Sequence, residues 1–331
     1  YRPSGDPGDR RSVERTVAAR AVVLSTGGAA ALWSRTTNPP GSIGQGLLLA
    51  HAAGAPLADL EFVQFHPTAV IGVQGREGFL ITEAIRGEGA TLHDSAGERF
   101  VDELAPRDEV SRAIQARMHE SGERSVSLDM REIDLALFPN VVGALREAGL
   151  DPSRELVPVA PAAHYTIGGV ATDLRARSTV AGLYAVGETA CTGLHGANRL
   201  ASNSLSECFV FGRRAALAAL EEPPLPGAAS RSASAPVIPA DWRSEGSQIG
   251  HRATRVALWE HAGIERSAEG LASLLDDPHP LARLIARSAL ERKETRGTHA
   301  RTDHPDRDAR LEGRHVVVSS VGARLDWQAW E

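Results

Sequence analysis

The sequence predicts an α/β protein that carries an inserted α+β domain and continues into a helical domain. Two short apolar runs, residues 21–25 and 182–186, each lead into glycine, as buried strands do where they enter tight turns. The segment between them, residues 80–165, is richer in charge, and residues 241–295 return to helical periodicity. The expected parts are a divided α/β domain at 1–79 and 166–222, a cap at 80–165, a linker at 223–239, and a helical domain with a tail at 240–331.

Shorter patterns predict individual elements within these parts. Residues 46–53 favour a small-residue helix, and residues 60–65 favour a strand that Pro67 stops. Residues 109–118 predict a helix in the cap, and residues 4–8 predict a loop because they alternate glycine, proline and polar residues.

A further helix is expected at residues 204–220. Ser204 and Glu207 fit a capping box, in which the hydroxyl and the carboxylate satisfy free N–H groups of the first helical turn. The tail from about Asp303 is charged and shows no clear pattern.

The composition limits the possible classes of function. Of the 331 residues, 24% are charged, and the formal net charge of -6 offers no footprint for a polyanion. Nucleic acid is therefore not an expected partner. No apolar run approaches the roughly 18 residues that are needed to span a bilayer, so no membrane span is expected.

The two cysteines, Cys191 and Cys208, do not have the spacing of a metal site. We expect both to be small buried thiols in a reducing, cytoplasmic compartment. The chain begins at Tyr1 and shows no signal peptide, so we expect it to be a piece of a longer sequence.

Four clusters hold the residue types that suit binding or catalysis. A lone histidine is more often structural, and the glycine-flanked charges after Thr82 suit surface ion pairs equally well. Glycine next to histidine permits positive φ and a close approach of the backbone. The clusters are residues 64–68, 82–89, 163–169 and 187–205.

Together the clusters contain three histidines and two arginines within glycine-rich backbone. Arginine matches a carboxylate with a planar fork of donors, so two arginines and two histidines suit a dicarboxylate. No Ser-His-Asp nucleophile motif and no His/Cys metal cluster is present. These patterns predict an anion-binding oxidoreductase site.

The same residues resemble the flavoprotein family of succinate dehydrogenase, fumarate reductase and L-aspartate oxidase. The resemblance runs from about Val22 to Pro305, and several motifs agree in order and spacing. They are residues 25–28 (Ser-Thr-Gly-Gly), 61–68, 82–90, 105–108 (Ala-Pro-Arg-Asp), 163–169, 187–207 and 292–299.

Within the family, alanine at several positions favours the L-aspartate oxidase branch. The respiratory subunits tend to have glycine at several of these positions. The segments that carry this difference are residues 66–69, 82–84, 87–90 and 201–205.

The resemblance implies a role for each matching residue. Arg107 matches the family's active-site arginine, which delivers or removes a proton during the transfer at the substrate carbon. The substrate carboxylates would be held by His66, Thr82, His164 and Arg199, and Glu83 would orient these side chains. The residues that would contact the flavin are Thr26, Gly27, Gly28, Gln45, Glu188, Asn203, Ser204 and Leu205.

The resemblance also implies a non-covalent FAD cofactor and a reaction. L-Aspartate would lose a hydride from Cα to the flavin and become iminoaspartate, and oxygen or fumarate would reoxidise the flavin. The flavin carries the redox chemistry, while the protein supplies orientation and electrostatics. Iminoaspartate feeds NAD biosynthesis, which makes quinolinate synthase a candidate partner.

The sequence departs from the family at two places. The family opens with a strand, a G-x-G-x-x-G turn and a helix that bind the ADP half of the flavin, and this unit is missing here. The α/β domain is therefore expected to be an incomplete FAD-binding (Rossmann-like) domain. Gln45 stands where the family usually has Asp, and it keeps an acceptor while losing the charge.

Three alternatives follow from these departures. The chain is part of an active L-aspartate oxidase, a flavin-free remnant that folds poorly or acts only as an assembly partner, or a respiratory flavoprotein subunit. A respiratory subunit would need a histidine that binds flavin covalently, from a region that is also missing.

Overall fold

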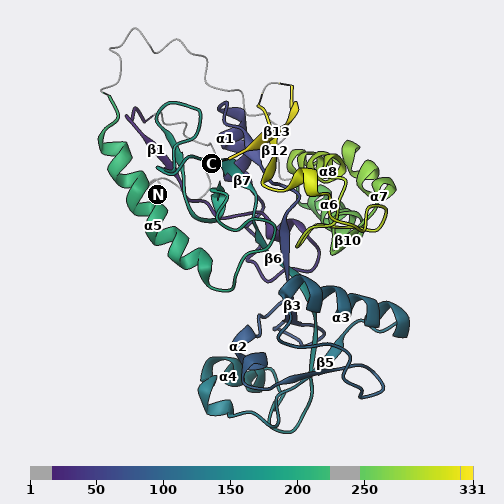
Figure 1. The fold of residues 1–331 in the computed structure, drawn as a ribbon. Coiled ribbons are helices and arrows are strands. Elements are labelled where there is room, and N and C mark those ends of the chain that lie inside the picture. The colour runs from purple at the N-terminus through teal and green to yellow at the C-terminus, as the bar shows by residue number, and fades with distance from the viewer. Residues whose placement is uncertain (1–16, 224–246, 321, 331) are drawn as a thin grey trace, which may run out of the picture.

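The computed structural model describes residues 17–223, 247–320 and 322–330, and it has three regions (Figure 1). An α/β region lies beside a group of C-terminal helices, and a cap projects away from both. The loop expected at residues 4–8 and all but the first residue of the linker expected at 223–239 lie outside the described residues. None of the described helices has both the length and the apolar character needed to cross a membrane.

The α/β region joins two segments that are far apart in the sequence. Strand β1 (Val22–Leu24) pairs in parallel with β8 (Leu183–Ala185). Gly27 and Gly187, which follow the two strands, both have positive φ. The predicted strands that lead into glycine turns are therefore confirmed at both places.

The predicted helices of this region are also present. Helix α1 (Gln45–Ala52) and helix α5 (Asn203–Leu220) each begin one residue before the predicted start. The α5 helix runs along one side of the α/β region, with its N-terminal end nearest the cap (Figure 1).

One hydrophobic core joins both α/β segments to the C-terminal helices. Trp33 is fully buried, and its indole Nε1 donates a hydrogen bond of 3.0 Å to the carbonyl of Ala262. The same core contains Leu47 from α1 and Leu183 from β8. The two α/β segments share it because each is too small to bury a core alone. The C-terminal helices are α6 (Ser247–His261), α7 (Ala268–Ser273) and α8 (Pro280–Glu291).

The tail after Asp303 is more ordered than its sequence pattern indicated. It forms an antiparallel hairpin whose inner strand, β12, pairs with β2, so that Val317 lies opposite Ala58. Val316, Val317 and Val318 are buried there. The resulting sheet has the order β13 (Leu325–Ala329), β12 (Arg314–Val318), β2 (Leu57–Ala58), β7 (Gly169–Ala171), β9 (Ala190–Cys191).

The cap is built on a four-stranded antiparallel sheet with its own hydrophobic core. Helix α3 (Arg107–Ser121) packs on this sheet and contains the helix predicted at 109–118. The first strand lies before residue 80, so the sheet extends beyond the expected cap boundary. The strand order is β3 (Val63–Val70), β6 (Val157–Thr166), β5 (Val126–Asp129), β4 (Thr91–His93), and the other helices are α2 (Glu83–Gly87) and α4 (Pro139–Glu147).

Two predictions about single residues are wrong. Strand β3 continues through Pro67 because its pairing with β6 shifts register between His66 and Ala69. Proline lacks an N–H donor, and an irregularity in the ladder removes the need for one. Cys191 is buried as expected, but Cys208 is an exposed free thiol on α5.

Short elements complete the described residues. They are the 3₁₀ helices η1 (Ala30–Leu32), η2 (Leu135–Leu137), η3 (Gly187–Thr189), η6 (Leu274–Asp276) and η7 (Ala309–Leu311), and the parallel pair β10 (Glu265–Arg266) and β11 (Ala300–Arg301).

Candidate active site

Arg107 occupies the first turn of α3, where the cap meets the α/β region. Its side chain is only 9% exposed. Its Nε donates to Glu83 Oε2 at 2.6 Å, and one terminal nitrogen donates to Gln64 Oε1 at 2.9 Å. Contacts from α2 and β3 therefore hold the guanidinium on two sides.

Gln64 connects this arginine to Arg199. The Nε2 group of Gln64 donates to the Arg199 carbonyl at 2.6 Å and to Asn198 Oδ1 at 2.9 Å. The two arginines that the sequence singles out thus lie at one junction, although they are far apart along the chain.

Arg199 is 6% exposed, and its guanidinium lies 4.4 Å from the centre of the Tyr165 ring. One terminal nitrogen is 3.3 Å from the Leu200 carbonyl and 3.4 Å from Ser204 Oγ. Its buried Nε has no hydrogen-bond partner among the described residues. Burial lowers the pKa of Arg199, and nearby Arg107 lowers it further.

His66 lies on β3 and is 1% exposed. Its Nδ1 accepts a hydrogen bond of 3.3 Å from the backbone N–H of Thr68, which places the proton of a neutral ring on Nε2. That Nε2 is buried and has no partner within the described chain. Burial lowers the pKa of His66 well below its usual range, and Arg107 adds to the effect.

His164 lies on β6 beside His66, with the ring centres 5.3 Å apart. Its Nδ1 is 2.8 Å from Thr37 Oγ1. Burial, together with nearby Arg107 and Arg199, lowers the pKa of His164 to about 3. Both imidazoles are therefore neutral near pH 7 and can donate a hydrogen bond without bringing a charge.

Thr82 completes the group of predicted substrate residues. It caps helix α2, and its hydroxyl accepts a hydrogen bond of 3.4 Å from the Ala84 N–H. Glu83, the next residue, is the partner of Arg107. The structure thus brings together His66, Thr82, Glu83, Arg107, His164 and Arg199.

A second group, predicted to contact a flavin, lies next to these residues. A side chain at Gly28 would overlap Thr166 and Glu188, so only glycine fits this close approach. Glu188 Oε1 accepts hydrogen bonds from the N–H and hydroxyl of Thr166, at 2.9 Å and 3.1 Å. Burial raises the pKa of Glu188, and these two hydrogen bonds oppose the shift.

The turn at Thr26 and Gly27 packs against helix α1. The Thr26 N–H donates to Thr189 Oγ1 at 2.8 Å, and a side chain at Gly46 would overlap Thr26. Gln45, the first residue of α1, is exposed beside this turn. Its amide is available to a ligand at the same edge as Gly28.

The start of α5 differs from the predicted capping box. The N-cap is Ser202, with φ of 62° and no side-chain cap, and Ser204 lies inside the first turn. Glu207 instead binds His195 Nε2 at 2.8 Å and Thr192 Oγ1 at 2.6 Å. The capping-box pattern failed because a buried polar network claims the carboxylate.

The open helix start fits the edge of a flavin. A helix N-terminus carries free N–H groups and partial positive charge. The Ser204 N–H has no acceptor in the described part of the chain, whereas the Leu205 N–H already donates to the Ser202 carbonyl at 3.0 Å. Of these two residues, only Ser204 therefore has a backbone N–H that is free to bind a ligand.

Several contributors to the site were not assigned a role from the sequence. Gln64 and Thr37 hold Arg107 and His164, and Tyr165 lies under Arg199. Gln64 lies two residues before His66 on β3, and Tyr165 directly follows His164 on β6. Their closeness to these histidines in the sequence is a signal that could have identified them. Thr37 lies far from His164 in the sequence and meets it only in the folded chain, so no sequence signal pointed to it.

Comparison with protein families matches two models to the chain. The model described as "FAD binding domain" matches residues 5–205, and the model described as "Fumarate reductase flavoprotein C-term" matches residues 274–329. Among curated proteins, L-aspartate oxidase of Agrobacterium fabrum is 46% identical over 91% of this chain, and that of Pyrococcus abyssi is 44% identical over 86%. The chain spans about 60% of the length of these relatives.

Solved structures agree with the sequence comparison. An E. coli quinol fumarate reductase FrdA variant is 30% identical, with a TM-score of 0.78, over 93% of this chain and 65% of its own. A quinol-fumarate reductase with menaquinol molecules is 31% identical, with a TM-score of 0.79, over 94% of this chain and 66% of its own.

Proposed function

The chain belongs to the FAD binding domain family, and from its 46% identity to the L-aspartate oxidase of Agrobacterium fabrum we propose that it forms the substrate site of an L-aspartate oxidase. FAD is the cofactor of this fold. The proposed reaction oxidises L-aspartate to iminoaspartate. The proposed parts are a divided flavin domain, the cap and the C-terminal helical domain, with the substrate bound where the cap meets the flavin domain.

One observation carries the proposal for the substrate. His66 Nε2 and Arg199 Nε are buried donors without partners in the described part of the chain, and Arg107 lies beside them. An unpaired buried donor is costly, so a bound acceptor would stabilise this arrangement. A four-carbon dicarboxylate has a carboxylate at each end and can satisfy both donors.

We assign the substrate carboxylates to His66, Thr82, His164 and Arg199. His66 would donate through Nε2–H, since Nδ1 already accepts from Thr68. Arg199 would supply the charge, and the two neutral histidines would add directional donors.

We assign proton transfer to Arg107. Oxidation of the C–N bond removes a hydride from Cα and a proton from the amino group, which leaves a C=N double bond. Bound FAD supplies the oxidant that accepts the hydride. Glu83, which accepts a hydrogen bond from Arg107 Nε and is 37% exposed, gives the proton a path toward solvent.

The residues proposed to hold FAD are Thr26, Gly27, Gly28, Gln45, Glu188, Asn203, Ser204 and Leu205. Gly28 allows close approach, Glu188 offers a carboxylate to a ribityl or ribose hydroxyl, and the start of α5 faces negative charge on the ring. Leu205 would contribute an exposed side chain rather than its N–H group.

The function is tested by mixing FAD-loaded protein with L-aspartate, L-glutamate or succinate without oxygen. We expect L-aspartate to bleach the flavin absorbance much faster than the other two. Rapid bleaching by succinate alone would instead support a respiratory subunit, an alternative that the fumarate reductase structures favour. Failure of all three compounds would overturn both assignments.

We also propose the surroundings of the reaction. Oxygen or fumarate would reoxidise the flavin, and quinolinate synthase would consume iminoaspartate in the cytoplasm. Mixing purified quinolinate synthase and its three-carbon co-substrate with the turning-over enzyme tests the last step, since quinolinate should form only when both proteins are present.

A further inference from the structure

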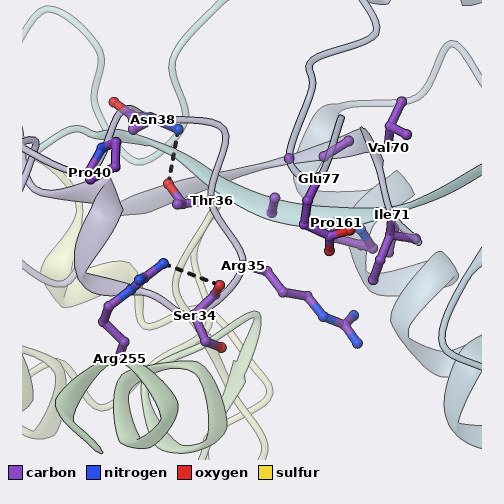
Figure 2. Close-up of a pocket in the computed structure, with 14 residues that line it drawn as sticks. Ser34, Arg35, Thr36, Asn38, Pro40, Val70, Ile71, Glu77, Pro161 and Arg255 are labelled. Atoms are coloured by element: carbon purple, nitrogen blue, oxygen red, sulfur yellow. Dashed lines mark hydrogen bonds between the residues drawn. The ribbon is translucent and has the colours of Figure 1, made fainter. Parts of the chain in front are cut away.

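A cavity of about 260 Å³ lies behind the segment that holds His164 (Figure 2). Its walls come from residues between 34 and 40, from the end of β3 and the middle of β6, from residues 77–78, and from Arg255 on α6. None of the residues assigned above to substrate or flavin lines it. The cavity is therefore a separate space at the point where the cap, the α/β region and the C-terminal helices meet.

Arg35 enters this cavity without a hydrogen-bond or ion-pair partner among the described residues. Its guanidinium lies 5.0 Å from the centre of the Trp259 ring. Arg255, by contrast, donates to the carbonyls of Trp33 and Ser34 at 3.3 Å and 3.4 Å. Figure 2 shows Arg35 extended between the Arg255 side of the cavity and the Ile71 side. A guanidinium has five N–H donors, so the free side of Arg35 is suited to a carboxylate.

The balance of charge around Arg35 favours an anion. Burial lowers the pKa of Arg35, and nearby Arg124 lowers it further, while Glu77 opposes both effects. Glu77 forms no ion pair with Arg35 among the described residues, and its Oε2 accepts a hydrogen bond of 2.8 Å from the Gly72 N–H. The lining of the cavity thus carries two positively charged side chains, Arg35 and Arg255, and one carboxylate, that of Glu77.

The opposite wall is apolar. It is formed by Ala69, Val70, Ile71, Ala160, Pro161 and Ala162. We propose that the cavity binds a small monocarboxylate with a short aliphatic chain, with the carboxylate on Arg35 and the chain against Val70 and Ile71.

Such a ligand would act on the candidate active site through residues 36–38. Thr36 pairs with Ala163, and Thr37 Oγ1 and Asn38 Nδ2 bind His164 at Nδ1 and at its carbonyl, at 2.8 Å and 2.7 Å. A ligand that orders this segment holds His164 in its binding geometry, so dicarboxylate and monocarboxylate should favour each other's binding. This coupling rests on the proposed function, whereas the binding of the monocarboxylate does not.

Butyrate is the probe, with n-butylamine as the probe of opposite charge. Calorimetry and tryptophan fluorescence should show saturable binding of butyrate at one site, because Trp259 lies under Arg35. Butylamine should not bind. Arg35→Met keeps the apolar stem on Trp259 and should weaken butyrate binding at least about tenfold, as expected for the loss of a charged hydrogen bond. The matched control is Arg154→Met, whose side chain is 84% exposed on the cap.

Two further variants locate the probe and test the coupling. Arg35→Lys keeps the charge and should retain part of the butyrate binding. Partial binding by this variant would show that the weaker binding of Arg35→Met comes from the lost charge and not from a fold disturbed by substitution at this position. Arg199→Lys should leave butyrate binding unchanged while weakening succinate binding. The proposal is overturned if butyrate does not saturate, if Arg35→Met binds it like the control, or if Arg199→Lys abolishes its binding. If butyrate binds but does not change the affinity for succinate, the coupling is overturned and the butyrate site stands.

Discussion

Two regions of the molecule differ in the kind of side chain that they bury or expose. They are the junction between the cap and the α/β region, and the outer face of α5. At the junction, His66, Arg107 and Arg199 are at most 9% exposed. On α5, Leu205, Phe209 and Leu220 are at least 65% exposed. Polar groups are enclosed in the first region and large apolar groups face outward in the second, which reverses the usual distribution.

The contrast separates enclosed polar residues that we propose to bind a ligand from large apolar residues that the described fold leaves exposed. Enclosed charges and unpaired donors cost stability, and a bound ligand would offset that cost. The outer face of α5 contributes little to the described fold, since its large apolar side chains are exposed. Substitutions in the two regions should therefore affect different measurements.

The largest effect on stability should separate the two sides of α5. Phe211 is 6% exposed in a small core with Tyr184 and Ala215, whereas Phe209 is 81% exposed. Phe211→Ala should lower the free energy of unfolding by about 3 kcal/mol or more, because it leaves a cavity. Phe209→Ala should change it by about 0.5 kcal/mol or less. Urea denaturation measures both, and equal losses would mean that the outer face is covered.

The largest effect on function should come from Arg199→Lys. Lysine keeps the charge but loses the planar pair of donors, and a misplacement of the substrate by about 1 Å can cost on the order of a hundredfold in rate. The variant should reduce its flavin with L-aspartate about a hundredfold more slowly and unfold at the wild-type temperature. Arg310→Lys, at a side chain that is 89% exposed, is the control. A normal rate would remove Arg199 from the site.

A smaller effect should follow from changing the support under Arg199. Tyr165→Leu removes the ring that lies 4.4 Å from the guanidinium, and a desolvated cation–π contact is worth about 1–2 kcal/mol. Roughly a tenfold rise in KM for L-aspartate is expected, with a smaller change in kcat. Tyr165→Phe keeps the ring face and should behave almost like the wild type. An equal loss in both variants would assign the role to the hydroxyl, which is 3.4 Å from Glu207.

The sequence predicted those parts of the fold that local patterns encode. Runs that lead into glycine located β1 and β8, and helical periodicity located α1, α3 and α5 to within a few residues. The tail hairpin was missed because its strands are specified by pairing with β2, about 260 residues earlier, rather than by an alternation of their own. The strand end predicted at Pro67 was wrong because a register shift accommodates the proline.

Site residues were predicted through the resemblance, and their partners were not. His66, His164 and Arg199 stand in recognisable motifs, so their convergence was expected. Gln64 acts through a contact with Arg199 that spans 135 residues, and Thr37 through a contact with His164 that spans 127 residues. Glu207 contacts Tyr165 across 42 residues. Such contacts depend on how the parts pack, and no local pattern records them. The roles of all these residues remain predictions.

The effect on acid stability is spread over several pH units, and it distinguishes the junction from exposed sites. The pKa of His164 is about 3 in the folded protein, against about 6.5 in an unfolded chain. Between these values the unfolded chain binds a proton that the folded protein does not, so stability falls as the pH falls, by up to about 1.4 kcal/mol per pH unit. His164→Gln should remove this contribution, so the variant should lose less stability than the wild type between about pH 6.5 and pH 4. His119→Gln, at an exposed position on α3, should follow the wild type. Parallel curves for wild type and His164→Gln would show that His164 is not shielded from water and protons, and that the junction is open rather than enclosed.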